Sequence, residues 1–222
     1  MLQMLTPEHQ AMFLEIAKLV SLIDDELTFD NNSEEEKLFN DNFEGISFLE
    51  NEYEIQTIRR FSLECGINEV SSPVKKPSKN TSSSELISGA DKIPKMLLIA
   101  IGCGVLKKHL NDPGERLHAG IGILRNIVSG CVLPEASEAV QNEGEDEGEE
   151  NPCPFTVTVA KVMLFELMLL AMAGGEISDS QWCLIEEFAN LVGVEHFVLE
   201  DLRERAVATN KEASRTLALI LE

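Results

Sequence analysis

A long apolar segment in the C-terminal part of the chain stops at a short polar turn, and a second helical pattern follows at once. Residues 157–173 read VTVAKVMLFELMLLAMA, and the second pattern covers residues 182–192. Between them, Gly174-Gly175 tolerates the positive φ at which a helix ends, and Ser178 or Asp179 can cap the next helix. Because strand patterns are nearly absent from the chain, we predict an all-α fold, a compact bundle of helical hairpins.

The N-terminal segment shows the same order of features. Thr6 can cap a helix, Pro7 suits its first position, and Glu8 complements the positive end of its dipole. Apolar residues then recur at helical spacing and predict one buried face: Met12, Ile16, Leu19, Val20 and Ile23.

Two more helices are predicted before residue 68. Ser33 and Glu36 form a capping-box pattern ahead of one of them. The other runs from about Glu52 to Cys65 and ends at Gly66. Its inward residues are predicted to be Ile55, Ile58 and Phe61.

The two hairpin segments align at an offset of 150 positions. Phe13-Leu14 then falls on Met163-Leu164, and turn residues 24–28 fall on residues 174–178. Both segments run from an apolar helix through a sharp polar turn into an acidic helix, which indicates an internal pseudo-repeat.

Two compositional breaks divide the chain into blocks. Residues 69–89 are rich in Ser, Pro and Lys, and residues 134–154 contain the acidic run NEGEDEGEE. Such compositions predict flexible linkers. The blocks are therefore residues 1–68, 90–133 and 155–222, and we expect them to pack as one domain.

The middle block carries two apolar helical patterns joined by a turn at residues 111–114. Asp91 is predicted to cap the first of them. We expect the two helices of residues 90–133 to form a buried central pair.

Charge limits the partners that this chain can bind. The 222 residues contain 39 acidic and 18 basic side chains, which gives a formal net charge of −21. This balance disfavours nucleic acids and anionic membranes and favours a basic protein partner, a cation, or solubility alone.

Cysteine spacing and hydropathy indicate a cytoplasmic protein. The five cysteines form no C-x-x-C pair, so we predict reduced thiols rather than a zinc framework or disulfides. The N-terminal residues do not resemble a signal peptide. The longest apolar candidate, residues 96–106, is shorter than the ~20 residues that a membrane-spanning helix needs.

The segments LIDDELT (residues 22–28) and AMAGGEIS (residues 171–178) each lead from an apolar helix into an acidic turn. This order resembles the TerB-like (tellurite-resistance-associated) all-helical domain, over residues 7–66 and 155–209. The resemblance implies a pseudo-symmetric helical domain associated with bacterial stress or phage-defence systems, with a metal-linked acidic surface in some members. Asp24 keeps the family aspartate, whereas Gly174 replaces it in the second copy.

Oxygen-bearing side chains in the first turn follow the spacing of a calcium loop. Five of them take relative positions 1, 3, 7, 9 and 12: Asp24, Glu26, Asp30, Asn32 and Glu35. Phe29 stands where that loop requires glycine. Two interpretations stay open, a solvated acidic turn and a site for a divalent cation such as calcium. The predicted metal ligands are Asp24, Asp25, Glu26, Asp30 and Glu35.

No motif joins a nucleophile to a base, so we do not expect an enzyme. The sequence favours a bacterial stress- or defence-associated binding protein with an acidic surface. The alternative is an immunity or inhibitor protein that neutralises a basic toxin or nuclease through that surface. Homo-oligomerisation stays open.

Overall fold

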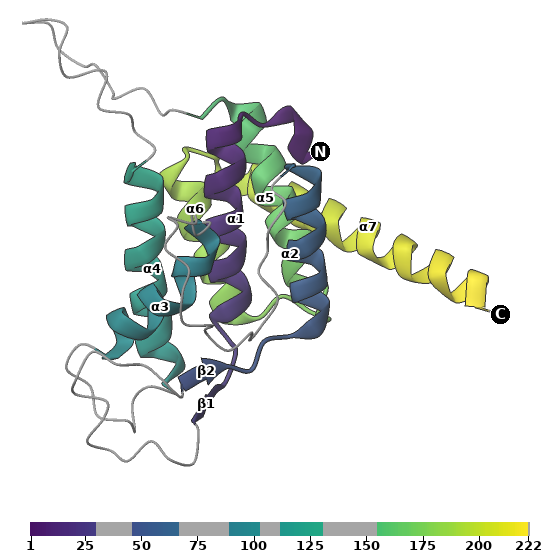
Figure 1. The fold of residues 1–222 in the computed structure, drawn as a ribbon. Coiled ribbons are helices and arrows are strands. Elements are labelled where there is room, and N and C mark those ends of the chain that lie inside the picture. The colour runs from purple at the N-terminus through teal and green to yellow at the C-terminus, as the bar shows by residue number, and fades with distance from the viewer. Residues whose placement is uncertain (30–45, 67–88, 103–111, 131–154, 222) are drawn as a thin grey trace, which may run out of the picture.

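The computed structural model describes residues 1–29, 46–66, 89–102, 112–130 and 155–221, and it confirms a helical fold (Figure 1). A short 3-10 helix, Leu2–Met4, precedes the first α-helix. The α-helices of the described part are α1 Pro7–Leu22, α2 Glu52–Glu64, α3 Gly89–Gly102, α4 Pro113–Gly130, α5 Val157–Ala171, α6 Asp179–Leu191 and α7 His196–Leu221.

Helices α1 and α5 lie at the centre of the bundle. They pack against each other, α1 also contacts α2, α3, α4 and α6, and α5 also contacts α2, α6 and α7. The predicted inward residues of α1 are all buried. The sequence predicted that residues 90–133 form a buried central pair. In the structure α3 and α4 bury Ile93, Leu97 and Leu124, whereas Met96 and Ile99 of α3 are exposed. An apolar stripe on one face places a helix at the periphery, whereas α5 is apolar on nearly every side.

The N-terminal hairpin consists of α1 and α2, and the C-terminal hairpin consists of α5 and α6. Corresponding helices of the two hairpins begin and end with similar capping residues. Thr6 accepts a hydrogen bond from the backbone amide of His9, and Thr156 accepts one from Val159, each at 3.3 Å. Helices α2 and α6 each span 13 residues and are capped by Asn51 and Ser178. Each is followed by a glycine in the left-handed region, Gly66 (φ 72°) or Gly193 (φ 70°).

Several boundaries differ from their predictions. Helix α3 begins at Gly89, so Asp91 lies inside its first turn and is not its cap. Helix α7 is continuous from His196 to Leu221. It packs against α5 and α6 and then runs on beyond the body of the bundle (Figure 1). The predicted helix after Ser33 and most of the two predicted linkers lie outside the described residues.

A small antiparallel ribbon follows the first turn, which the sequence did not predict. Strand β1 (Leu27–Phe29) pairs with β2 (Ile46–Phe48), with Thr28 opposite Ser47. The Thr28 hydroxyl donates to the carbonyl of Ser47 at 3.1 Å. Strands of three residues are too short to display the alternation of a strand in sequence.

Among the described helices, none has both the length and the apolar character needed to cross a bilayer.

Candidate functional site

The turns that follow α1 and α5 lie against the first residues of α2 and α6, and polar side chains gather there. We call this cluster the turn junction. It consists of Asp24, Asp25, Asn51, Glu54, Ser178 and Gln181.

Glu54 and Gln181 form the centre of the turn junction. They are the third residues of α2 and α6, and their exposed fractions are 5% and 4%. The Gln181 amide donates to the Glu54 carboxyl at 3.1 Å and to the carbonyl of Val20 at 3.5 Å. Its oxygen accepts from the backbone amide of Ser178 at 3.2 Å, so the side chain makes three hydrogen bonds, two donated and one accepted.

The carboxyls of Glu54 and Asp25 titrate near neutral pH. Burial raises the pKa of Glu54 to about 7, a change that the hydrogen bond from Gln181 partly opposes. Burial and then the charge of Glu50 raise the pKa of Asp25 to about 7, and Lys18 opposes this rise. The charge of Asp25 also raises the pKa of Glu54, so these carboxyls hold protons at a pH at which ordinary carboxyls have lost them.

Asp24 joins the first turn to α6. The Ser178 hydroxyl donates to the Asp24 carboxylate and also accepts from the backbone amide of Gln181 at 3.1 Å. One serine therefore caps α6 and binds the other hairpin.

Gly174 in the second turn lies close to the start of α2, just as Asp24 in the first turn lies close to the start of α6. A Cβ atom at this position would lie 2.6 Å from Nδ2 of Asn51, the residue that caps α2. The second turn thus packs on the start of α2 because it has no side chain there. The neighbouring Gly175 has φ 133°, which confirms the predicted need for glycine at this reversal.

Two basic side chains of the described part lie next to the turn junction, and each is bonded to a neighbouring oxygen. Arg116 of α4 is 5% exposed and donates through Nη1 to the backbone carbonyl of Asp25. Lys18 of α1 lies 2.5 Å from the Glu50 carboxylate. Arg116 Nε and Asp25 Oδ2 are buried, and neither has a hydrogen-bond partner among the described residues.

The structure describes three of the five predicted metal ligands, and their surroundings differ. Asp24 binds Ser178, Asp25 is partly buried, and Glu26 is exposed. Asp30 and Glu35 lie outside the described residues. No group of three His, Cys, Asp or Glu side chains that could hold a metal ion occurs within the described ranges. The cation site therefore stays a prediction.

Sequence reasoning missed Glu54, Gln181 and Arg116. The prediction placed Ile55 inward, but Ile55 is only partly buried and Glu54 takes the buried position. The signal was present: Asn51-x-x-Glu54 and Ser178-x-x-Gln181 both have the spacing of a helix cap and its third residue.

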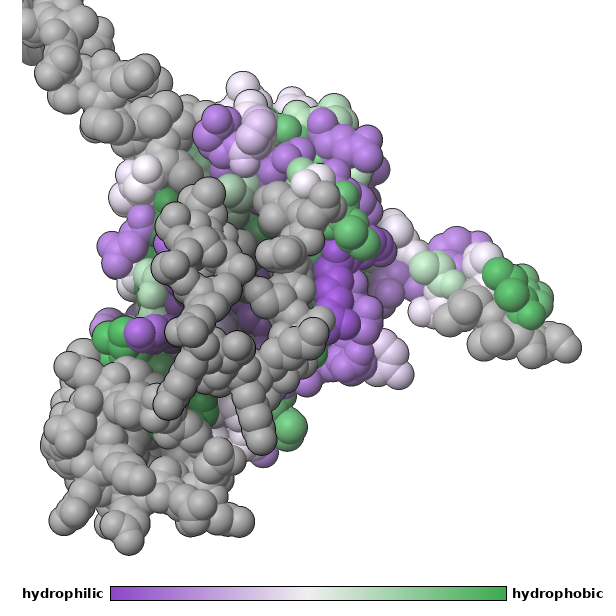
Figure 2. Space-filling view, in the orientation of Figure 1, coloured by the Kyte–Doolittle hydropathy of each residue, from purple (hydrophilic) through white to green (hydrophobic). Residues whose placement is uncertain are grey.

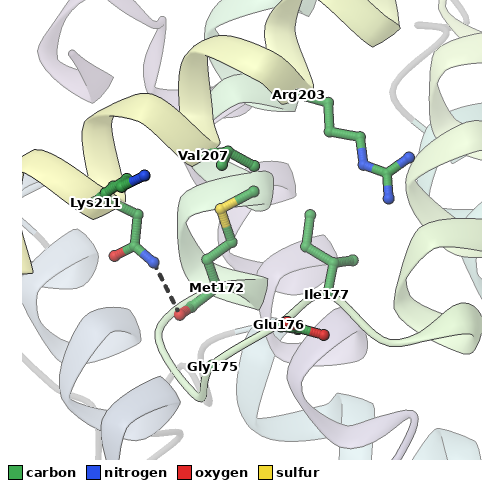
Figure 3. A pocket seen from close by; sticks show the side chains of 8 residues that line it. Met172, Gly175, Glu176, Ile177, Arg203, Val207 and Lys211 are labelled. Carbon is green, nitrogen blue, oxygen red and sulfur yellow. Dashed lines mark hydrogen bonds between the residues drawn. The ribbon is translucent and has the colours of Figure 1, made fainter.

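A second feature is an open groove of about 430 Å³ between the α5–α6 turn and α7, which we call the α7 groove (Figure 3). The Asn210 amide donates to the Met172 carbonyl across it at 3.5 Å. Its lining combines apolar and charged side chains from both elements: Met172, Gly175, Glu176, Ile177, Arg203, Val207, Asn210 and Lys211.

No family model, curated protein or solved structure matches this chain. The turn junction can hold and release protons near pH 7 and presents carboxylates at one end of the bundle.

Proposed function

We propose that this protein is a non-enzymatic binding protein that takes up a basic protein at its acidic end, in a bacterial stress- or defence-associated role in the cytoplasm. The acidic end comprises exposed carboxylates around the turn junction: Asp24, Glu26, Glu50, Glu52, Glu176 and Asp179. The observation that carries this proposal is the state of the cations there. Lys18 and Arg116 are already bonded or buried, so this surface keeps an excess of negative charge for a partner.

The relation between the hairpins supports a TerB-like architecture. The caps of α1 and α5 lie 150 positions apart, and those of α2 and α6 lie 127 positions apart. Contacts also cross reciprocally: the first turn meets Ser178, and the second meets Asn51. Such reciprocity is expected of a duplicated helical hairpin folded on itself.

Charge reversal tests the acidic end. The variant Glu26→Lys, Glu52→Lys, Glu176→Lys is compared with a control that reverses three exposed acids elsewhere, Glu8→Lys, Glu195→Lys, Glu204→Lys. Partner capture at low and high salt is measured by affinity purification and then by binding kinetics with the captured protein. We expect the first variant to slow association about 10-fold or more at low salt, and the control much less. Equal losses would assign the effect to net charge and reject a defined acidic end.

A divalent cation such as calcium is the second candidate ligand of this end. It is favoured by Asp25 Oδ2, which is buried without a hydrogen-bond partner among the described residues. Unfolding of EDTA-treated protein with and without millimolar calcium tests it. A ligand at 100 times its Kd adds about 2.7 kcal/mol to the free energy of unfolding, and Asp25→Asn should remove this gain. If calcium has no effect, while one basic toxin or nuclease binds tightly, the immunity role is favoured.

A further inference from the structure

One wall of the α7 groove is a single face of α7. Arg203, Val207 and Lys211 line it at intervals of four residues, so their side chains leave the same side of the helix. Figure 3 shows Arg203 and Lys211 towards opposite ends of the groove, with Val207 between them. At the rise of an α-helix, the two basic residues lie about 12 Å apart along the axis. This wall therefore has an apolar centre between two cations.

The opposite wall is the α5–α6 turn, which adds apolar surface and one carboxylate. Met172 and Ile177 supply the apolar side chains, and Glu176 is exposed beside them (Figure 3). Glu176 also belongs to the acidic end. The groove and the acidic end are therefore parts of one continuous surface.

The charged side chains of the groove do not neutralise one another. Within the part of the chain that the structure describes, the side chains of Glu176 and Lys211 make no hydrogen bond or ion pair. The Arg203 guanidinium lies over the Trp182 ring at 4.4 Å, and its nearest carboxylate, that of Glu200, is 3.9 Å away, beyond hydrogen-bonding distance. Stacking on a ring fixes a guanidinium and leaves its N–H groups available. A ligand can therefore bind two cations and one carboxylate here.

This combination of charges favours the C-terminus of a basic polypeptide. An acidic segment would be repelled by Glu176 and by a chain of net charge −21. A basic segment without a terminus would bring only cations to Arg203 and Lys211. A basic chain that ends in the groove offers an α-carboxylate, which a guanidinium binds through two parallel hydrogen bonds, and a cation for Glu176.

We propose that the α7 groove binds the C-terminus of the basic partner, with the terminal carboxylate on Arg203 and an aliphatic last side chain on Val207. This inference rests on the function proposed above. The preceding backbone runs along α7 and reaches Lys211, a donor to its carbonyls, after about four extended residues. A basic side chain of this stretch pairs with Glu176. Past the groove, α7 projects from the bundle with hydrophilic and apolar surface side by side (Figure 2), so the bound chain can continue along it.

Two labelled hexapeptides that differ only at their C-terminus test the role of the carboxylate. Both have the sequence AKRKAL, one as the free acid and one as the C-terminal amide, and fluorescence anisotropy with the full chain measures Kd. We expect the free acid to bind about 10-fold more tightly. General attraction to an acidic protein predicts the opposite order, because the amide carries one more net positive charge. Equal Kd values, or tighter binding of the amide, overturn the proposal.

Arg203→Gln and Arg205→Gln are a matched pair of variants. Both remove one charge from an exposed residue of α7, but Arg205 does not line the groove and pairs with Asp201. Arg203→Gln should abolish the preference for the free acid, and Arg205→Gln should preserve it. Equal effects of the two substitutions would mean that net charge, and not the groove, selects the peptide.

Two further outcomes separate this inference from the function on which it rests. If reversal of the acidic end abolishes partner capture while the two peptides bind equally, the groove is rejected and the acidic end stands. A third peptide, AGSGAL as the free acid, has no basic side chain and should bind about 10-fold more weakly than AKRKAL. If it binds as tightly, the basic character of the partner is rejected, and the function proposed above fails with it.

Discussion

The turns after α1 and after α5 occupy matched places in the bundle, yet their chemistry is opposite. The first turn carries Asp24 and Asp25 and leads to a helix whose buried third residue is Glu54. The second carries two glycines and leads to a helix with Gln181 at the same position. One half thus supplies charge and the other supplies an amide and room for close approach. A carboxyl facing an amide forms a good buried hydrogen bond, whereas two facing carboxylates would repel each other.

The largest loss of stability is expected from the aromatic pairs buried in the two hairpins, α1–α2 and α5–α6. Phe61 of α2 packs edge-on against Phe13 at 5.2 Å, and Phe188 of α6 packs edge-on against Phe155 at 6.4 Å. Because both side chains are fully buried, Phe61→Ala and Phe188→Ala should each lower the free energy of unfolding by about 3–5 kcal/mol. Urea unfolding measures the loss, with the exposed Leu63→Ala as the control. A large loss from only one of them would show that the halves do not unfold together.

Giving the second turn the aspartate of the first should disrupt their packing. Gly174→Asp places a Cβ atom against Asn51, which must then move away from its capping position. We expect a loss of about 1–3 kcal/mol, measured by urea unfolding.

A shorter side chain at Asn51 should compensate for Gly174→Asp. Asn51→Ser keeps a capping hydroxyl and makes room, so the double variant should recover part of the loss. Simple additivity of the two substitutions would contradict the close approach of the turns.

Changing the Glu54–Gln181 pair should alter how stability depends on pH. The pKa of Glu54 rises on folding from 4.5 to about 7, so the folded state holds more protons than the unfolded state within this window. Stability therefore falls as pH rises from 4.5 to 7 and then levels off.

Glu54→Gln should reduce that slope and raise Tm at pH 8 by about 2–4 °C. Gln181→Glu places a second carboxyl at the contact and should lower Tm at pH 8 and steepen the slope. Thermal unfolding between pH 4.5 and 8 measures Tm and its pH dependence for both variants. Asp25→Asn shows how much of the pH dependence comes from Asp25. Parallel pH profiles for all variants would mean that Glu54 is solvated in the folded protein.

The smallest expected effect concerns the bond between Asp24 and Ser178. Asp24 is exposed, so Asp24→Ala should cost only about 0.5–1.5 kcal/mol in urea unfolding. Ser178→Ala loses a helix cap as well and should cost more. In the Ser178→Ala background, Asp24→Ala should cost almost nothing. An unchanged cost there would mean that Asp24 acts through another contact.

Predictions from sequence succeeded where the cause was local. The apolar face of α1 and the glycine reversal at Gly175 were predicted and observed, and of the two predicted caps, Ser178 and Asp179, the structure has Ser178. They depend on residues within a few positions of one another, whose spacing is visible in the chain. The start of α3 was missed because this helix begins at a glycine and continues through Pro94.

By itself the sequence determined that this chain is helical and acidic, because periodicity, capping and charge are properties of short stretches. The tertiary structure alone decided that Glu54 meets Gln181, that Asp24 reaches Ser178, and that Arg116 lies against Asp25. These contacts join residues between 91 and 154 positions apart, and no local propensity encodes them. They arise because burying α1 and α5 together brings the two turns to one end of the bundle.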